Sequence, residues 1–291
     1  MPPQTTLFTL GPYNVESVLG QGAMATIYAA NRNSSSVALK VLSGQAAGQF
    51  HIRQLFLREY RLVSHLRHPN IIHMHDVGEF NGRFYIAMDL VPGETLEELL
   101  ARRKTLGEAP AMAIIRQIAE ALDYIHGEGI VHRDIKPGNI MVSPNGRAVL
   151  FDFGAALDIN NPDDSDSKGI FGTPSFIAPE QIRNERLDGR ADLYALGIVG
   201  YLMLSGRRPF YGARSEILDA HQHVEPLPPS QHSYVSPGIE RIILKLLAKN
   251  PDDRYTTGAA LIEALDNVDI VPEPQRPELG QRVMNWFRNR P

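Results

Sequence analysis

The stretch VHRDIKPGNIMV, residues 131–142, places charged and amide side chains between apolar residues. Arg133 and Asp134 are neighbours in this stretch. Lys136 follows the Asp by two positions, and Asn139 follows the Lys by three. A charge among apolar neighbours costs free energy unless a partner compensates it. We therefore expect these groups to meet in one short loop that forms the polar part of a site.

A second polar position follows this loop. The sequence FDFG, residues 151–154, places Asp152 thirteen residues after Asn139. A carboxylate near an amide oxygen and a second carboxylate supplies the oxygen ligands that Mg²⁺ prefers, and Lys136 beside them suits a phosphate. The alternative is an ordinary strand–loop–strand with solvated charges, which the combined spacing disfavours.

The two motifs together resemble the catalytic core of the protein kinases. The resemblance implies that Asp134 accepts or orients the proton of the substrate hydroxyl and that Lys136 offsets charge on the transferred phosphoryl group. It implies that Asn139 and Asp152 hold Mg²⁺, with Mn²⁺ as the alternative metal, beside the phosphates of ATP. Arg133 is then the receptor for a phosphate on the activation loop.

The N-terminal part carries motifs that fit the nucleotide site of the same family. LGQGAMATIY, residues 19–28, fits a Gly-rich loop over the phosphates, with Ala25 in place of its third Gly, although an ordinary hairpin turn is the alternative. VALK supplies Lys40 for the α- and β-phosphates, and Glu59 is the only acid between Lys40 and Asp76 that can pair with it. The resemblance implies a nucleotide site made by Leu19, Gly20, Gln21, Gly22, Ala23, Met24, Ala25, Ile27, Ala38, Lys40, Glu59, Met88, Asp89, Val91 and Met141.

The sequence after the DFG motif extends the resemblance. FGTPSFIAPE, residues 171–180, resembles the end of a kinase activation segment, with Glu180 expected to pair with Arg254. Asp192 matches the position that anchors the catalytic loop. Lys136 together with Thr173 favours serine and threonine as acceptors, and we expect the Thr173 hydroxyl to hold Asp134 and Lys136. The sequence over residues 12–268 is most similar to bacterial Hanks-type Ser/Thr kinases.

The pattern of elements predicts an α+β chain with the bilobal kinase-like fold, in which a small β-rich N-lobe precedes a larger helical C-lobe. Strands are expected within 12–42 and 70–91, and a helix over 50–67. Further helices are expected at 95–102, 110–126, 179–185, 190–205, 215–222, 236–249 and 256–267. The expected divisions are an N-lobe at 12–91, a C-lobe at 92–269, and a Pro-containing linker with a short amphipathic tail at 270–291.

Composition restricts the classes of function. The chain has 291 residues, a net charge of −4 and no Cys, so general attraction to nucleic acid and thiol or Cys–zinc chemistry are not expected. Its start lacks the pattern of a secretory signal, and no apolar run is long enough to span a bilayer. We expect a cytoplasmic protein.

Two further stretches of sequence suggest a metal site and a membrane contact, and both interpretations are disfavoured. The His-rich run SHLRHPNIIHMHDV, residues 64–77, invites a metal site, but no Cys or acid completes a ligand set. The tail RVMNWFRNR, residues 282–290, could touch a membrane, although one short helix binds weakly and a docked terminal helix is the duller interpretation.

The leading functional prediction is a protein Ser/Thr kinase that uses MgATP, autophosphorylates and acts on protein substrates. Self-association for phosphorylation in trans is a further expectation. A pseudokinase binding module and a small-molecule phosphotransferase are the alternatives. The presence of Lys40, Asp134, Asn139 and Asp152 argues against the first, and Arg133 with the APE sequence argues against the second.

An acidic segment suggests a switch. NPDDSDSKGIFGTP, residues 161–174, contains few apolar residues and is expected to be mobile when unmodified. Phosphate on Ser165 or Ser167 could pair with Arg133 and order the segment. The alternative is that the Asp residues of the segment already supply the charge, which would make the kinase constitutively active.

Overall fold

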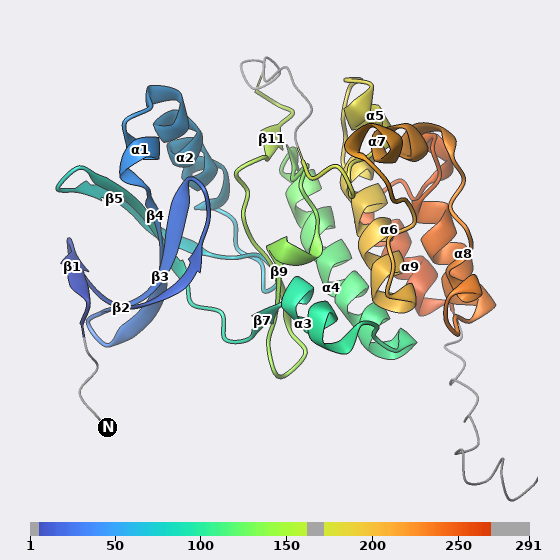
Figure 1. Cartoon of the computed structure of the whole chain (residues 1–291), viewed down its shortest axis with the longest axis horizontal. Coiled ribbons are helices and arrows are strands. Elements are labelled where there is room, and N and C mark those ends of the chain that lie inside the picture. Colours follow the sequence, from blue (N-terminus) through green and yellow to red (C-terminus); the bar gives the residue numbers. More distant parts are fainter. Residues whose placement is uncertain (1–5, 162–171, 269–291) are drawn as a thin grey trace, which may run out of the picture.

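The computed structural model describes residues 6–161 and 172–268. The chain first forms a six-stranded antiparallel sheet with the order β1-β2-β3-β4-β6-β5, beside which the helical part lies (Figure 1). The strands are β1 (Phe8–Leu10), β2 (Tyr13–Gln21), β3 (Ala25–Arg32), β4 (Ser35–Leu42), β5 (Met74–Phe80) and β6 (Arg83–Asp89). The expected sequence of strands, helix and strands in this lobe is confirmed.

Strand alternation divides the sheet into two apolar faces. Ala38 lies opposite Met88, and Ile27 lies opposite Lys40, so these side chains share one face. The other face carries a separate buried cluster that includes Leu10, Val15, Leu39 and Ala87. Because successive side chains point to opposite faces of a sheet, Leu39 packs in the separate cluster of the first lobe, whereas Lys40 faces the second lobe.

Helix α2 (Phe50–Val63) packs in the main apolar cluster beneath the sheet, and the short α1 (Gly44–Ala47), which the sequence did not predict, precedes it. The prediction that the helix continues to residue 67 is wrong. The Arg67 guanidinium donates to the carbonyls of Ser64 and Leu66. This satisfies acceptors at the helix end, and Pro69 disfavours helical backbone at the residue before it.

The second lobe is built around helix α6 (Arg190–Ser205), in which 14 of 16 residues are buried. A helix that is apolar around its circumference lies inside a fold, and α6 packs against α4 and α8. The helices of the lobe are α3 (Leu96–Arg103), α4 (Glu108–Gly127), α5 (Pro179–Ile182), α6, α7 (Arg214–His223), α8 (Pro237–Leu246) and α9 (Gly258–Asp266), with 3₁₀ turns η1 (Pro137–Asn139), η3 (Pro229–Gln231) and η4 (Pro251–Asp253).

All seven expected helices of this lobe are present. Helix α5 is shorter than the expected range of 179–185, because Asn184 adopts a left-handed conformation with φ of 54° that ends a helix. The bilobal kinase-like fold is thereby confirmed as an arrangement of elements.

Five very short strands lie where the helical lobe meets the sheet. They are β7 (Glu94–Thr95), β8 (Ile130–Val131), β9 (Ile140–Val142), β10 (Ala148–Leu150) and β11 (Leu157–Asp158). Strands β10, β9 and β7 form one sheet, and β11 pairs with β8. The loop between β8 and β9 is thus held at both ends by strand pairing, and this loop carries Arg133 to Asn139.

Some expectations fall outside the described residues. They include Ser165 and Ser167 of the acidic segment and the tail at 270–291. Among the described residues, no helix combines the length and apolar character that crossing a membrane requires.

Candidate active site

Asp192 at the start of α6 holds the loop between β8 and β9. Its carboxylate accepts hydrogen bonds from the backbone N–H groups of His132 and Arg133, both at 2.8 Å, and lies 2.9 Å from the His126 ring. Burial raises the pKa of Asp192, but the His126 contact and the backbone donors outweigh it and leave the pKa below its usual value. The side chain therefore stays charged inside the protein, and it fixes the start of the loop as the sequence predicts.

The loop itself contains backbone that the sequence does not reveal. Arg133 has φ of 65°, which is unusual for a residue other than Gly. Its Nε donates to the Ala155 carbonyl at 2.6 Å, and Gln181 donates to the Arg133 carbonyl at 3.2 Å. Such strained positions persist where surrounding contacts determine them. Arg133 thus connects the loop to the segment after the DFG motif and to helix α5.

Asp134 is the centre of the polar network. One carboxylate oxygen accepts from the Lys136 ammonium at 2.6 Å, and the other accepts from the Thr173 hydroxyl at 2.9 Å. Lys136 also donates to the Thr173 hydroxyl at 3.1 Å. Asn139 donates to the Asp134 backbone carbonyl at 2.8 Å and to its carboxylate at 3.1 Å. The four residues, which the sequence separates by up to 39 positions, form one hydrogen-bonded unit.

Gly172 allows Thr173 to reach this unit. Its φ is 106°, and an added Cβ would lie 2.7 Å from the Arg133 carbonyl oxygen. A side chain at this position would therefore be strained and would collide with the catalytic-loop backbone. The Thr173 backbone N–H then also donates to Asp134, at 2.9 Å.

Helix α7 supports the segment that follows Thr173. His221 on α7 is fully buried, its Nδ1 lies 2.8 Å from the Tyr194 hydroxyl, and its ring contacts Phe210 edge-on. Burial lowers the pKa of His221 to about 4, although the backbone of Pro174 and Ser175 opposes the shift. Arg208 donates to the Ser175 hydroxyl. The sequence analysis did not identify this support, because the His has no motif around it.

A second charged cluster joins the two lobes. The Lys40 ammonium on β4 donates to the two carboxylate oxygens of Glu59 at 2.8 and 2.7 Å and to Asp152 at 2.9 Å. Glu59 comes from α2, and Asp152 comes from the segment after β10. One cation therefore links the sheet, the helix of the first lobe and the second lobe.

Lys40 and Asp152 maintain each other's charge, whereas burial raises the pKa of Glu59 above its usual value despite the nearby Lys40. Burial lowers the pKa of Lys40, but the two carboxylates outweigh this effect and raise the pKa well above its ordinary value. Burial raises the pKa of Asp152, and Lys40 again reverses the effect and leaves it low. Lys40 stays protonated and Asp152 stays ionised, which are the charge states required to bind phosphate and a metal ion.

The residues around Asp152 fix its orientation. Asp152 has φ of 63°, and the following Phe153 is completely buried with its ring 4.7 Å from the His132 ring. His132, Phe153, Val63 and Met74 are all buried.

The oxygen atoms suit a hard cation. Among the described residues, the Asn139 side-chain oxygen and the second Asp152 carboxylate oxygen accept no hydrogen bond, so both retain free lone pairs. Amide and carboxylate oxygens are ligands that fit Mg²⁺. The donor set therefore fits the metal that the sequence suggests. Within residues 6–161 and 172–268, no cluster of three or more His, Asp or Glu side chains forms a separate metal site.

The hairpin between β2 and β3 lies beside β4, the strand that carries Lys40. Gly20 pairs with Ile27 across the hairpin, and Gly22 donates to the Ala25 carbonyl at 2.9 Å. The side chains of Leu19 and Met24 are more than half exposed, so these two residues of the loop do not pack into the core. Leu19, Gly20 and Gln21 belong to β2, Gly22, Ala23 and Met24 to the turn, and Ala25 begins β3.

The remaining residues expected at the nucleotide site lie on β4, β6 and β9 and at the connection between the lobes. Ala38 on β4 and Met88 on β6 are buried and lie opposite each other. Asp89 and Val91 lie at the connection between the lobes, where the Asp89 carboxylate is 2.8 Å from the His75 ring. Met141 on β9 approaches from the second lobe and packs against the main core.

A buried ion pair closes the segment after Thr173. The Arg254 guanidinium donates to both carboxylate oxygens of Glu180, at 2.6 and 2.8 Å, and it also donates to three backbone carbonyls. This is the pair that the sequence predicts. Its bidentate geometry fixes helix α5 against the end of the helical lobe.

Comparison with known proteins gives one consistent family. Residues 13–265 match the family model described as a protein kinase domain. The chain is 38% identical over 280 residues to the serine/threonine-protein kinase PknB of Mycolicibacterium smegmatis, covering 92% of this chain and 44% of the relative. It is 34% identical to PknA of Mycobacterium tuberculosis, covering 95% of this chain and 66% of that protein.

The structure is also similar to a crystal structure of the Mycobacterium tuberculosis PknI kinase domain. The TM-score is 0.71 with 31% sequence identity, and the match covers 90% of this chain and 98% of that one. The chain spans about half the length of the curated relatives that it first matches.

Proposed function

The chain belongs to the protein kinase family as a domain of the bacterial serine/threonine type, and we propose that it transfers the γ-phosphoryl group of MgATP to serine and threonine hydroxyls of proteins, its own included. The family expected from the sequence is thus confirmed, and the activity is the proposal. The observation that carries it is the Lys40–Glu59–Asp152 cluster, with 2.7–2.9 Å contacts, beside the Asp134 network.

The proposed chemistry uses the side chains where they lie. Asp134 orients the acceptor hydroxyl and takes its proton, because its carboxylate is held by Lys136 and Thr173 at the end of a fixed loop. Lys136 offsets the charge that develops on the transferred group. Lys40 holds the α- and β-phosphates, and Asn139 with Asp152 would hold Mg²⁺, which neutralises phosphate charge.

The choice of serine and threonine rests on the contacts of Thr173. Its hydroxyl donates to Asp134 and accepts from Lys136, so this residue type completes the catalytic loop. We assign the N-lobe to residues 12–91, the C-lobe to 92–269 and a separate linker and tail to 270–291. We further propose cytoplasmic action, where MgATP is available, and self-association for phosphorylation in trans.

Regulation by a phosphate on Ser165 or Ser167 is a separate part of the proposal. Arg133 would receive the phosphate, and a groove beside α2 contains two further arginines together with two acidic residues. This groove lies between α2 and the segment after β11, and Arg58, Arg61, His51 and His65 are among the residues that line it. Clusters of Arg bind phosphate through charge-assisted hydrogen bonds. A phosphate carries more charge and more acceptor oxygens than a carboxylate, which favours a modified segment over permanent activity from the Asp residues alone.

One experiment tests the activity. The purified full chain is incubated with MgATP and a serine-, threonine- and tyrosine-containing peptide mixture, and the products are identified by mass spectrometry. We expect phosphate on serine and threonine of the chain and of peptides, and none with Asp134→Asn. Nucleotide binding without transfer would instead identify a binding module, and transfer only to an added small alcohol would identify a small-molecule phosphotransferase.

A further inference from the structure

Lys249 lies in a cluster of groups that joins helix α7 to the loop before η4. Its ammonium donates to the Ala220 carbonyl at 3.1 Å and lies 4.4 Å from the centre of the Phe210 ring. The Lys249 side chain is partly exposed, whereas Phe210 is buried. In the part of the chain that the structure describes, no carboxylate pairs with this ammonium. A carbonyl and a ring face therefore hold a partly buried cation.

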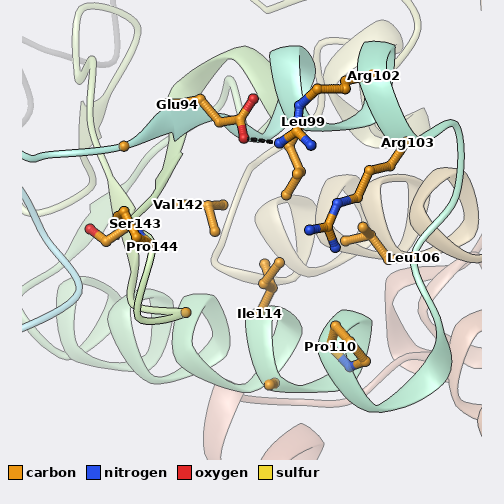
Figure 2. Close-up of a pocket in the computed structure, with 13 residues that line it drawn as sticks. Glu94, Leu99, Arg102, Arg103, Leu106, Pro110, Ile114, Val142, Ser143 and Pro144 are labelled. Atoms are coloured by element: carbon orange, nitrogen blue, oxygen red, sulfur yellow. Dashed lines mark hydrogen bonds and ion pairs between the residues drawn. The ribbon is translucent and has the colours of Figure 1, made fainter.

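The other described lysines have different surroundings. Carboxylates pair with Lys40 and Lys136. Lys104 is exposed directly after α3, the helix that borders the open groove shown in Figure 2. Lys245 on α8 is exposed as well. Partial burial without a carboxylate thus distinguishes Lys249 among the lysines that the structure describes.

These surroundings activate the Lys249 amine as a nucleophile. Burial lowers the pKa of Lys249 to about 8, and the neighbouring Arg254 guanidinium adds to the shift, although Glu225 opposes it. A lysine that is desolvated, or that lies beside another cation, is a known form of activated nucleophile. The contacts of the amine therefore favour covalent chemistry at this position.

The gain in reactivity can be worked out. At pH 7.5 roughly a quarter of amines with this pKa are uncharged, against about one in a thousand for an ordinary lysine. Lower basicity weakens a nucleophile by about tenfold over this interval, on the scale known for thiols. A net advantage of about tenfold remains over an ordinary lysine.

We propose that Lys249 is an acylation site, at which the amine takes the acyl group of a small activated donor, an acyl phosphate or an acyl thioester. The ammonium first loses one proton to solvent. The amine nitrogen then attacks the carbonyl carbon, a C–N bond forms, and the bond from this carbon to the phosphate oxygen or thioester sulfur breaks. The phosphate or thiolate leaves with the bonding electron pair and takes up the second proton from nitrogen.

The environment of Lys249 favours this modification over methylation. Burial without a carboxylate penalises a charged group far more than a neutral amide. Acylation removes the charge of lysine, whereas methylation keeps it. The amide product is thus better suited to the site than the ammonium that it replaces.

Acylation of Lys249 acts on the C-terminal end of α7. The Val224 N–H also donates to the Ala220 carbonyl, at 3.0 Å, so Lys249 reinforces the last turn of the helix. A cation near a helix C-terminus is favourable because of the helix dipole, and acylation removes this charge together with the cation contact to Phe210. His221 in the same helix supports the segment that precedes α5. This effect on a segment beside the catalytic loop rests on the proposed function for its meaning, whereas the reactivity of the amine does not.

The rate of acylation in the purified full chain tests the site. The chain is exposed at pH 7.5, without MgATP, to acetyl phosphate or to acetyl-coenzyme A, and the modified fraction of each lysine is followed by quantitative mass spectrometry. The same reaction in the urea-unfolded chain gives the rate of each lysine without its surroundings. The donor that reacts faster identifies the class of acyl group.

We expect Lys249 to react about tenfold faster in the folded chain than in the unfolded chain. Its rate should be half-maximal at a pH of about 8. Lys104 and Lys245 serve as internal controls, because both are exposed and should react at similar rates in the two states.

Two variants test the effect on α7. Lys249→Gln carries a neutral amide and should raise hydrogen–deuterium exchange of the last-turn backbone amides by about two- to fivefold. Lys249→Arg keeps the charge and the donors, so its exchange should stay close to that of the wild type. Lys245→Gln, on the neighbouring helix α8, is the matched control and should change nothing in α7. Thermal melts show whether all variants are folded.

Three results would overturn the inference: a Lys249 rate no higher in the folded than in the unfolded chain, a gain of the same size at Lys104 and Lys245, or equal exchange in Lys249→Gln and Lys249→Arg. The acylation assay needs no ATP and no acceptor hydroxyl, so its failure leaves the proposed kinase activity intact. Failure of the kinase activity in turn leaves the acylation rates unchanged.

Discussion

The Glu180–Arg254 pair offers the sharpest test of how the helical lobe is held together. The exposed fractions of the two side chains are 5% and 0%. Removing one partner of a buried pair leaves an uncompensated charge, which costs about 3–5 kcal/mol. Arg254→Met also leaves the carbonyls of Ala248, Lys249 and Arg190 without this donor. We therefore expect the loss in free energy of unfolding to lie at the upper end of that range.

The loss is large relative to the total. Proteins have free energies of unfolding of about 5–15 kcal/mol, and 1 kcal/mol corresponds to roughly 2–4 °C in the melting temperature at this size. Arg254→Met should thus lower the melting temperature by roughly 10 °C or more. Urea unfolding followed by circular dichroism gives the corresponding free energy.

The double variant Glu180→Leu, Arg254→Met makes the test decisive. Replacing both members of a buried pair by apolar residues removes the stranded charge. The double variant should be more stable than Arg254→Met by at least about 1 kcal/mol, despite carrying one more substitution. If the loss in free energy of unfolding of the double variant equals the sum of the losses of Glu180→Leu and Arg254→Met, the pair does not act as a unit and the reasoning is refuted.

Four other predictions follow from the site and the tail. Lys40→Met and Asp152→Asn should each fold, as a melt would show, yet lose nearly all transfer to a peptide; wild-type turnover in either would contradict the site assignment. Truncation after Asp269 should leave folding and transfer intact, whereas a large drop in melting temperature would place the tail in the core. The double variant Ser165→Ala, Ser167→Ala should be less active than the autophosphorylated wild type, and equal activity would favour the acidic segment alone. The pKa of His221 lies at about 4 in the folded protein, below the unfolded value of about 6.5, so between these pH values the unfolded state binds the extra proton. The free energy of unfolding should therefore fall as the pH drops from 6.5 to 4, by up to about 3 kcal/mol. The His221→Phe variant should lack this pH dependence when its unfolding is measured over the same range.

Local pattern predicted the long elements well. Helix α6 has the bounds 190–205 that its apolar run indicated, and the order of motifs from Gly20 to Arg254 predicted which side chains would meet. The helix bounds succeed because periodicity is a property of the chain itself, whereas the meeting of distant side chains was implied by the resemblance to the kinase family. The roles of the individual residues remain proposals.

Features that depend on distant contacts could not be predicted. Strands β7, β8 and β11 have two residues each, too few for a periodic pattern. The left-handed backbone at Arg133 and Asp152 is imposed by contacts with other segments. The groove beside Arg103 exists only because α3, α4 and the β9–β10 turn converge, and no single stretch of sequence contains it.

The contacts of Lys40 determine where control can be exerted. Lys40 comes from the sheet, Glu59 from α2 and Asp152 from the second lobe, so its ammonium reaches both carboxylates only when these three segments stand in one arrangement. A ligand shifts a conformational equilibrium only by its differential affinity for the two states. A molecule that binds better when α2 stands away from the sheet would therefore separate Glu59 from Lys40 without touching Asp134.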